Sequence, residues 1–173
     1  MARVDVWYFG YGSNLNQTIF VERRGMRPMD VRRGRLDDYV LRFNLPVGPG
    51  ERGVANVEAE TGAHTWGVAY LLRPEECERL DRSEGVPAGI YERIQVEIVT
   101  DGDERKSAFT YRSSRISEGR KPSARYMGLI LDGARAHALP PEWIALLEAF
   151  ELAVDEREES DPRYISGRDR TRA

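Results

Sequence analysis

Hydrophobic and polar positions alternate along several segments of the chain, a pattern typical of strands that turn one face toward a core. The alternation is cleanest over Tyr91–Thr100 and again over Arg105–Arg112, with Asp101-Gly102-Asp103 between them. These two runs and their turn residues predict a β-hairpin. The same pattern predicts further strands at Val4–Tyr11, Gly34–Val47, Gly53–Glu58 and His64–Leu72, with Glu60-Thr61-Gly62 as a turn between the last two.

Apolar residues at helical spacing mark four other segments. A helix is predicted over about Leu15–Arg24, with Ser13 or Asn14 as its N-cap. A second helix is predicted over Pro74–Glu84, because proline and acidic residues favour a first turn and Gly85 favours a stop. Two more are predicted at Ser123–Ala138 and from Pro140-Pro141 to Phe150.

Strands grouped around a few helices, without a regular β-α-β alternation, favour an α+β fold built on a mostly antiparallel sheet or small barrel. The length of 173 residues fits one domain. Residues 155–173 are highly charged and poor in core-forming types. We therefore expect a domain over residues 1–154 and a flexible or surface-docked tail over residues 155–173.

The charge balance bears on the choice of partner. Lysine and arginine number 26 and aspartate and glutamate 29, which gives a net charge of −3. Nucleic acids and anionic membranes are usually bound by proteins with a basic surplus, so neither is the expected partner. The arginine-rich segment Arg23–Arg35 is more typical of a solvated loop and strand edge. No apolar run approaches the roughly 20 residues of a membrane span, and the N-terminus lacks a signal-peptide pattern, so we expect a cytoplasmic protein.

Cysteine and histidine are scarce, which narrows the possible chemistry. Cys77 is the only cysteine, and His64 and His137 are the only histidines and are far apart in sequence. We therefore expect no metal site, and we expect Cys77 to be a buried structural residue. If the protein is an enzyme, its acid–base work falls to aspartate, glutamate, tyrosine or lysine.

Two features are candidates for a site. The turn at Gly10–Asn14 lets backbone N–H groups converge ahead of a helix, which suits a carboxylate or an oxyanion. An ordinary turn with a serine cap is the simpler interpretation. Glu84 stands at the C-terminal end of a predicted helix, where the helix dipole and burial by Val86 and Ile90 would favour its protonated form. The simpler interpretation of Glu84 is a solvated residue of an acidic helix.

Several longer motifs occur in a characteristic order. YFGYGSNL at Tyr8–Leu15 precedes WGVAY at Trp66–Tyr70, then DRSEGV at Asp81–Val86 and GIY at Gly89–Tyr91. SARY at Ser123–Tyr126 and LPPEW at Leu139–Trp143 follow. Over residues 5–150 these motifs resemble the gamma-glutamylcyclotransferase-like superfamily, which includes avirulence-induced-gene-like proteins.

The resemblance implies a small mixed, mostly antiparallel β-barrel with surrounding helices and a pocket at the barrel's mouth. It also implies a cofactor-free acyltransferase or lyase reaction in which a gamma-glutamyl compound expels its amine and closes to 5-oxoproline. Glu84 matches the acid/base glutamate of the superfamily. The residues that match its substrate-binding positions are Tyr11, Gly12, Ser13, Asn14 and Leu15 in the loop and Tyr91 and Tyr126 at the pocket.

The expected activity is release of 5-oxoproline and a free amino acid from a gamma-glutamyl amino acid or peptide, as in glutathione metabolism. The α-amine of such a substrate is its own nucleophile, so a protein with scattered histidines can carry out the reaction. A first alternative is a cyclotransferase of the same superfamily that acts on a gamma-glutamylamine or a biosynthetic intermediate. A second is a catalytically silent module that binds a small ligand. The resemblance permits a homodimer.

Overall fold

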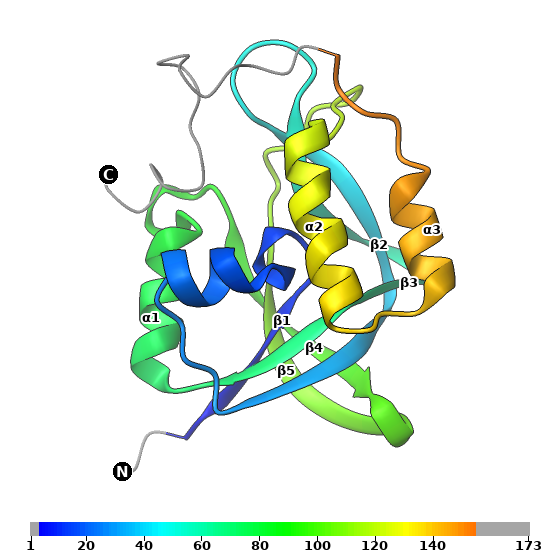
Figure 1. The fold of residues 1–173 in the computed structure, drawn as a ribbon. Helices are drawn as coiled ribbons and strands as arrows, with labels where there is room; N and C mark the ends of the chain where they lie inside the picture. Colours follow the sequence, from blue (N-terminus) through cyan, green and yellow to red (C-terminus); the bar gives the residue numbers. More distant parts are fainter. Residues whose placement is uncertain (1–3, 155–173) are drawn as a thin grey trace.

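The computed structural model describes residues 4–154, and within them five strands close into a barrel (Figure 1). In pairing order the strands are β1 (Val6–Gly10), β3 (Gly53–Leu72), β2 (Asp30–Pro46), β4 (Glu92–Thr100) and β5 (Glu104–Arg112). β1 pairs in parallel with β5, which closes the barrel, and the other ladders are antiparallel. The expected α+β fold with a small mixed, mostly antiparallel barrel is confirmed, as is the hairpin of β4 and β5. The predicted tail at residues 155–173 lies outside the described residues.

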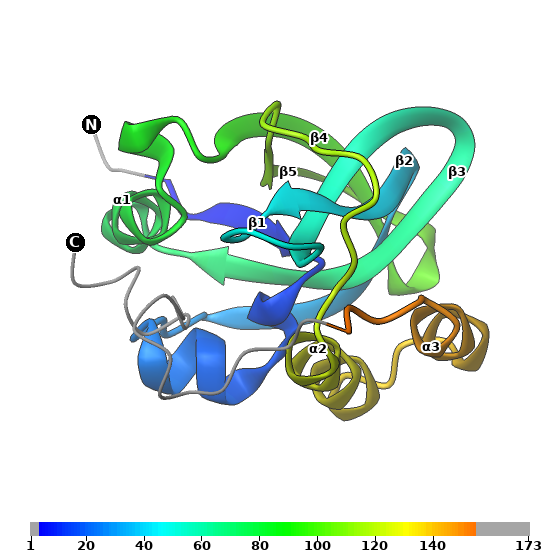
Figure 2. The ribbon, with the colours of Figure 1, turned by 90° about the horizontal axis from the view of Figure 1, so that it is seen from above.

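β3 is longer than the sequence pattern suggests and curves around the barrel (Figure 2). The predicted turn at Glu60-Thr61-Gly62 is wrong, because β3 runs through these residues without a break. The pairing of β2 with β3 shifts register between Asp37 and Tyr39. At this shift Asp38 has a left-handed φ of 62° and accepts a hydrogen bond from the Gly62 N–H at 2.9 Å. An irregularity in the partner strand therefore accommodates the turn-forming residues.

Three α-helices of the described chain cover the barrel from outside (Figure 2). They are α1 (Pro74–Ser83), α2 (Ala124–Ala136) and α3 (Pro141–Glu148). A short 3₁₀ turn, η3 (Val86–Ala88), follows α1, and another, η4 (Asp101–Asp103), connects β4 and β5. Ser123 caps α2 by accepting a hydrogen bond from the Tyr126 N–H. The predicted helices at these places are confirmed, since prolines and a capping serine mark where they begin. No helix within residues 4–154 has both the length and the apolar character of a membrane span.

The helix predicted over Leu15–Arg24 is instead a 3₁₀ turn, η1 (Ser13–Leu15), followed by a π-helix, η2 (Thr18–Arg23). Figure 1 shows η2 between α1 and α2. The cap is Asn16, whose Oδ1 accepts hydrogen bonds from two backbone N–H groups at the start of η2. The prediction of Ser13 or Asn14 as the cap is wrong, because the Asn14 amide is engaged with other side chains.

The loop after β1 is held in place by close packing against α2. A Cβ on Gly133 of α2 would lie 2.4 Å from the carbonyl carbon of Leu15, so only glycine permits this approach. Leu15 itself is fully buried. Around it the core consists of large side chains with almost no exposure, among them Phe9, Phe20, Leu36, Leu80, Ile98, Phe109 and Ile130. The tight core fixes the loop rigidly at the end of the barrel.

Candidate active site

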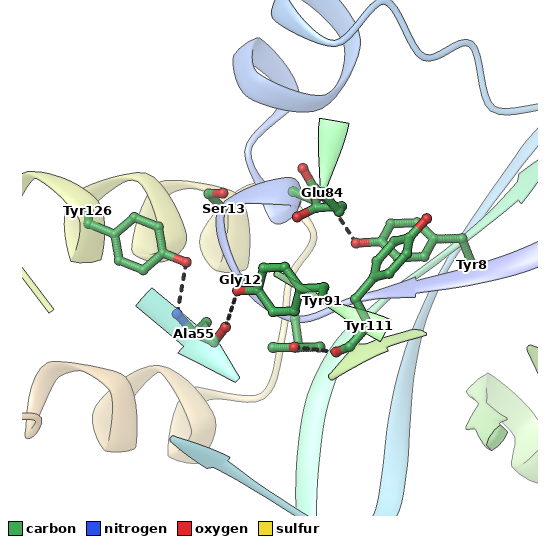
Figure 3. Close-up of a pocket in the computed structure, with 10 residues that line it drawn as sticks. Tyr8, Gly12, Ser13, Ala55, Glu84, Tyr91, Tyr111 and Tyr126 are labelled. Atoms are coloured by element: carbon green, nitrogen blue, oxygen red, sulfur yellow. Dashed lines mark hydrogen bonds between the residues drawn. The ribbon is translucent and has the colours of Figure 1, made fainter. Parts of the chain in front are cut away.

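A pocket opens where the loop after β1 meets the C-terminal end of α1 (Figure 3). The space between its walls is about 310 Å³ when the open solvent at its mouth is included. The residues that line it are Tyr8, Tyr11, Gly12, Ser13, Asn14, Ala55, Glu84, Tyr91, Tyr111 and Tyr126. Five of these side chains are phenols, so aromatic rings and their hydroxyl groups form much of the wall, together with the polar side chains of Ser13, Asn14 and Glu84.

Glu84 stands at the C-cap of α1, where its backbone N–H donates to the carbonyl of Leu80. The chain turns away at Gly85, which has a left-handed φ of 70°. A Cβ at Gly85 would lie 2.7 Å from Cδ1 of Ile90, so both conformation and space require glycine. The helix end and this turn together direct the Glu84 side chain into the pocket (Figure 3).

Asn14 connects Glu84 with the aromatic wall. Its Nδ2 donates to Glu84 Oε1 at 2.9 Å and to the Tyr8 hydroxyl at 2.8 Å. The Tyr70 hydroxyl donates to the Asn14 backbone carbonyl at 2.8 Å, which fixes the loop from behind. Asn14 Oδ1 is buried and has no hydrogen-bond partner among residues 4–154. An unpartnered buried acceptor costs free energy unless a ligand donates to it.

Arg24 approaches the same carboxylate from the end of η2. Its Nη2 lies 3.4 Å from Glu84 Oε1, and its Nη1 donates to the Ser83 hydroxyl at 2.6 Å. The Arg24 and Glu84 side chains are only 8% and 11% exposed. Glu84 Oε1 therefore faces two donors, whereas Oε2 accepts no hydrogen bond from the side chains and backbone of residues 4–154.

Two tyrosines bracket the backbone of Ala55 on β3 at the other side of the pocket (Figure 3). The Tyr91 hydroxyl donates to the Ala55 carbonyl at 2.6 Å, and the Ala55 N–H donates to the Tyr126 hydroxyl at 3.1 Å. The Tyr11 hydroxyl donates to the Tyr111 carbonyl at 2.5 Å. Each ring is thus fixed by main-chain groups of the barrel, which makes the shape of the pocket rigid.

Burial determines the protonation state of the inner tyrosines. Desolvation raises the pKa of Tyr8 and of Tyr11 far above the ordinary value of 10.0, and nearby negative charge at Glu84 adds to both shifts. Desolvation likewise raises the pKa of Tyr111, helped by the hydrogen bond that its hydroxyl donates to Asp81 Oδ1 at 2.5 Å. Asp81 also accepts two hydrogen bonds from Arg93. These phenols are neutral at physiological pH, so they act as hydrogen-bond donors and not as bases.

Gly12 lines the pocket opposite Ala55 and Tyr126. A Cβ on Gly12 would lie 3.0 Å from the Ala55 Cβ and 3.2 Å from the Tyr126 hydroxyl. The neighbouring Ser13 hydroxyl lines the pocket and makes no hydrogen bond with residues 4–154. The absence of a side chain at Gly12 therefore keeps the loop backbone accessible from the pocket.

The single cysteine and the two histidines are not among the residues that line the pocket. Cys77 is buried in α1, and desolvation raises the pKa of its thiol to about 11, which fits a structural residue. His64 and His137 do not line the pocket. Within residues 4–154 there is no group of three or more histidine, cysteine, aspartate or glutamate side chains that could hold a metal ion.

The structure brings together most of the residues singled out in the sequence. Glu84, the loop residues 11–14, Tyr91 and Tyr126 share one pocket, whereas Leu15 lies in the core and does not line it. Sequence reasoning missed Tyr8, Ala55 and Tyr111, which come from three strands, and Arg24, which it assigned to a solvated segment. Tyr8 lies within the first motif and was available as a signal; the other three depend on barrel closure and on the π-helix.

Comparison with known proteins finds similarity to the AIG2-like family and to gamma-glutamylcyclotransferases. A model of the AIG2-like family matches residues 64–147. The chain is 30% identical to gamma-glutamylcyclotransferase of Bos taurus, over 83% of this chain and 78% of that protein. It is 31% identical to the gamma-glutamylcyclotransferase of Mus musculus over the same shares. A solved structure of a gamma-glutamyl cyclotransferase superposes with a TM-score of 0.80 at 27% identity, covering 92% of this chain and 96% of that one.

Proposed function

The chain belongs to the gamma-glutamylcyclotransferase family, and we propose that it cyclises a gamma-glutamyl amino acid or peptide to 5-oxoproline, releasing the free amino acid or peptide. The membership makes it a cyclotransferase-type enzyme acting on a small gamma-glutamyl substrate. The proposal adds the leaving group, the product and the residues that carry the reaction.

The observation that carries the proposal is the state of the Glu84 carboxylate. One oxygen, Oε1, is held by Asn14 and Arg24, while Oε2 is left without a protein donor among residues 4–154, and the Glu84 side chain lines the pocket. A carboxylate fixed by one oxygen and free at the other is suited to take a proton from a bound group and return it. With the inner phenols neutral, Glu84 is the group in this pocket best suited to act as the base.

The proposed reaction begins with the substrate's α-ammonium group beside Glu84. Glu84 accepts a proton, and the α-amine attacks the γ-carbonyl carbon to form a five-membered ring and a tetrahedral intermediate. The bond to the leaving nitrogen then breaks as Glu84 returns the proton to that nitrogen. The proton still in excess on the ring nitrogen passes to the released amine through Glu84, so the amine leaves as an ammonium group. Atoms and charge balance without a further reactant, and the products are 5-oxoproline and the released amine.

Other residues of the pocket supply binding and orientation. The unpartnered Asn14 Oδ1 is an acceptor for a substrate N–H group. The loop backbone at Gly12 and the Ser13 hydroxyl are candidate donors for the oxyanion of the intermediate. The rigid rings of Tyr11, Tyr91 and Tyr126 would hold the extended glutamyl chain folded, so that amine and γ-carbonyl approach each other.

The test is to incubate the purified protein with a panel of substrates and to follow 5-oxoproline by mass spectrometry. The panel contains gamma-glutamyl amino acids, a gamma-glutamyl peptide of the glutathione type and gamma-glutamylamines, with α-glutamyl dipeptides as matched controls. We expect 5-oxoproline from gamma-glutamyl amino acids or peptides and none above background from the controls. Turnover of gamma-glutamylamines alone would favour the first alternative, a cyclotransferase of the same superfamily that acts on such amines. Absence of product from every member of the panel would favour a module that binds a small ligand without catalysis.

A further inference from the structure

The guanidinium of Arg24 is a buried cation that contacts the pocket only indirectly. It lies behind Glu84 and is not among the residues that line the pocket. Its Nη1 and Nη2 face Ser83 and Glu84, and its Nε is buried and has no hydrogen-bond partner within the described part of the chain. Ser83 and Glu84, which are consecutive at the end of α1, therefore both contact the Arg24 guanidinium.

Burial of this ion pair is poorly explained by stability. Removing two charges from water costs several kcal/mol per ion in practice, and well-packed apolar residues often replace such pairs without loss. The unpartnered Nε adds a further cost. An arrangement that is unfavourable on its own, placed against the carboxylate proposed to do the chemistry, points to a role in the reaction.

The backbone structure of η2 and of the segment after it positions Arg24 beside Glu84. η2 is a π-helix, and the Arg24 N–H closes it by donating to the Ile19 carbonyl five residues earlier. Such helices are rare and occur often at functional sites. Just beyond, the Arg27 N–H donates to Glu76 Oε1 of α1 at 2.7 Å. Glu76 is buried and its other oxygen accepts from the Arg73 N–H, so the segment after η2 is tied to the helix that carries Glu84.

We propose that Arg24 is a positioning residue that fixes Glu84 and supplies the positive charge that keeps its carboxylate ready to accept the substrate's proton. The inference rests on the proposed role of Glu84. Tyr8 of β1, Tyr11 of the following loop and Tyr111 of β5 also interact electrostatically with Glu84. These phenols are neutral, so Arg24 is the facing group that offsets the negative charge.

The test compares Arg24→Met and Arg24→Lys with the wild type by steady-state kinetics that determine kcat and KM separately. For Arg24→Met we expect kcat to fall at least about 10-fold with KM changed less than about 2-fold, because Arg24 positions Glu84 and does not line the pocket. Arg24→Lys retains the charge and should recover part of kcat, because a cation again faces the Glu84 carboxylate.

Two further variants keep the result interpretable. Ser83→Ala removes only the hydroxyl that anchors Nη1, so a smaller fall in kcat is expected even if Arg24→Met does not fold. Arg23→Met is the matched control, since Arg23 precedes Arg24 in the chain and makes no ion pair with Glu84. In a folded Arg24→Met protein, an unchanged kcat, or a loss of kcat that Arg24→Lys does not partly recover, would overturn the inference. Failure of the wild type to produce 5-oxoproline would instead overturn the proposed function.

Discussion

Replacement of Asn14 by aspartate tests the contact between the loop and Glu84 with almost no change in shape. Asn14 Nδ2 lies 2.9 Å from Glu84 Oε1. The substitution replaces a donor by a second carboxylate at that distance. Two unit charges 2.9 Å apart repel each other by about 6 kcal/mol at an effective dielectric constant of about 20. Arg24, at 3.4 Å from the same oxygen, offsets part of this repulsion.

The variant can relieve the repulsion by taking up one proton on folding. An ordinary carboxyl titrates near pH 4, so holding one protonated at pH 7 costs about 4 kcal/mol, and at pH 5 only about 1.4 kcal/mol. The folded variant then binds one more proton than the unfolded chain, so its stability falls as pH rises, by up to about 1.4 kcal/mol per unit. We expect the loss of stability relative to wild type to be about 2 kcal/mol larger at pH 7 than at pH 5.

Urea unfolding of wild type, Asn14→Asp and Asn14→Leu at pH 5, 6 and 7 measures this difference. Asn14→Leu is the matched control, because it removes the donor without adding a charge and its loss of stability should not vary with pH. Equal destabilisation of Asn14→Asp at all three pH values would refute the placement of Asn14 against the Glu84 carboxylate.

Three other predictions concern the pocket and its surroundings. Gly12→Val places a side chain 3.0 Å from Ala55 and should raise KM and lower kcat together in steady-state assays; unchanged kinetics would show that this part of the pocket is not used. Tyr111→Phe removes the hydrogen bond to Asp81 and should cost about 1.5–3 kcal/mol in urea unfolding; an unaltered midpoint would contradict it. Burial lowers the pKa of His137 below its ordinary 6.5, so the unfolded chain takes up the proton first and stability falls as pH drops through about 6.5. His137→Gln should lose less stability than the wild type between pH 7 and pH 5.5 in urea unfolding. An equal loss in the two proteins would show that His137 is not the source of this pH dependence.

The elements that could be predicted from sequence are those with a local signal. The hairpin of β4 and β5 follows from alternation on both sides of Asp101-Gly102-Asp103, and the end of α1 follows from Gly85. The π-helix η2 could not be predicted, because its spacing of apolar residues resembles that of an ordinary helix. The continuous β3 was missed because a register shift opposite Gly62 accommodates residues that usually form a turn.

The residues of the candidate site likewise fall into two groups, those with a local signal in the sequence and those without one. Glu84 and the loop 11–14 stand beside glycines and a helix end, which are features that a sequence displays. Arg24 was hidden in an arginine-rich segment, and only the π-helix and the contact of Glu76 with the Arg27 N–H bring it to Glu84. Tyr111 reaches the pocket because β5 closes the barrel against β1. Residues supplied by long-range pairing carry no local mark of their role.

The most direct measurement is the rate of 5-oxoproline formation by Glu84→Gln, compared with Glu75→Gln as a control on the exposed face of the same helix. The Glu84→Gln substitution keeps the shape of the side chain and removes its capacity to accept and return a proton. With the best substrate of the panel, kcat of Glu84→Gln should fall at least about 100-fold while its unfolding midpoint stays close to that of the wild type. Glu75→Gln should retain wild-type turnover. A folded Glu84→Gln protein with near-normal kcat would contradict the assignment of Glu84 as the acid–base residue.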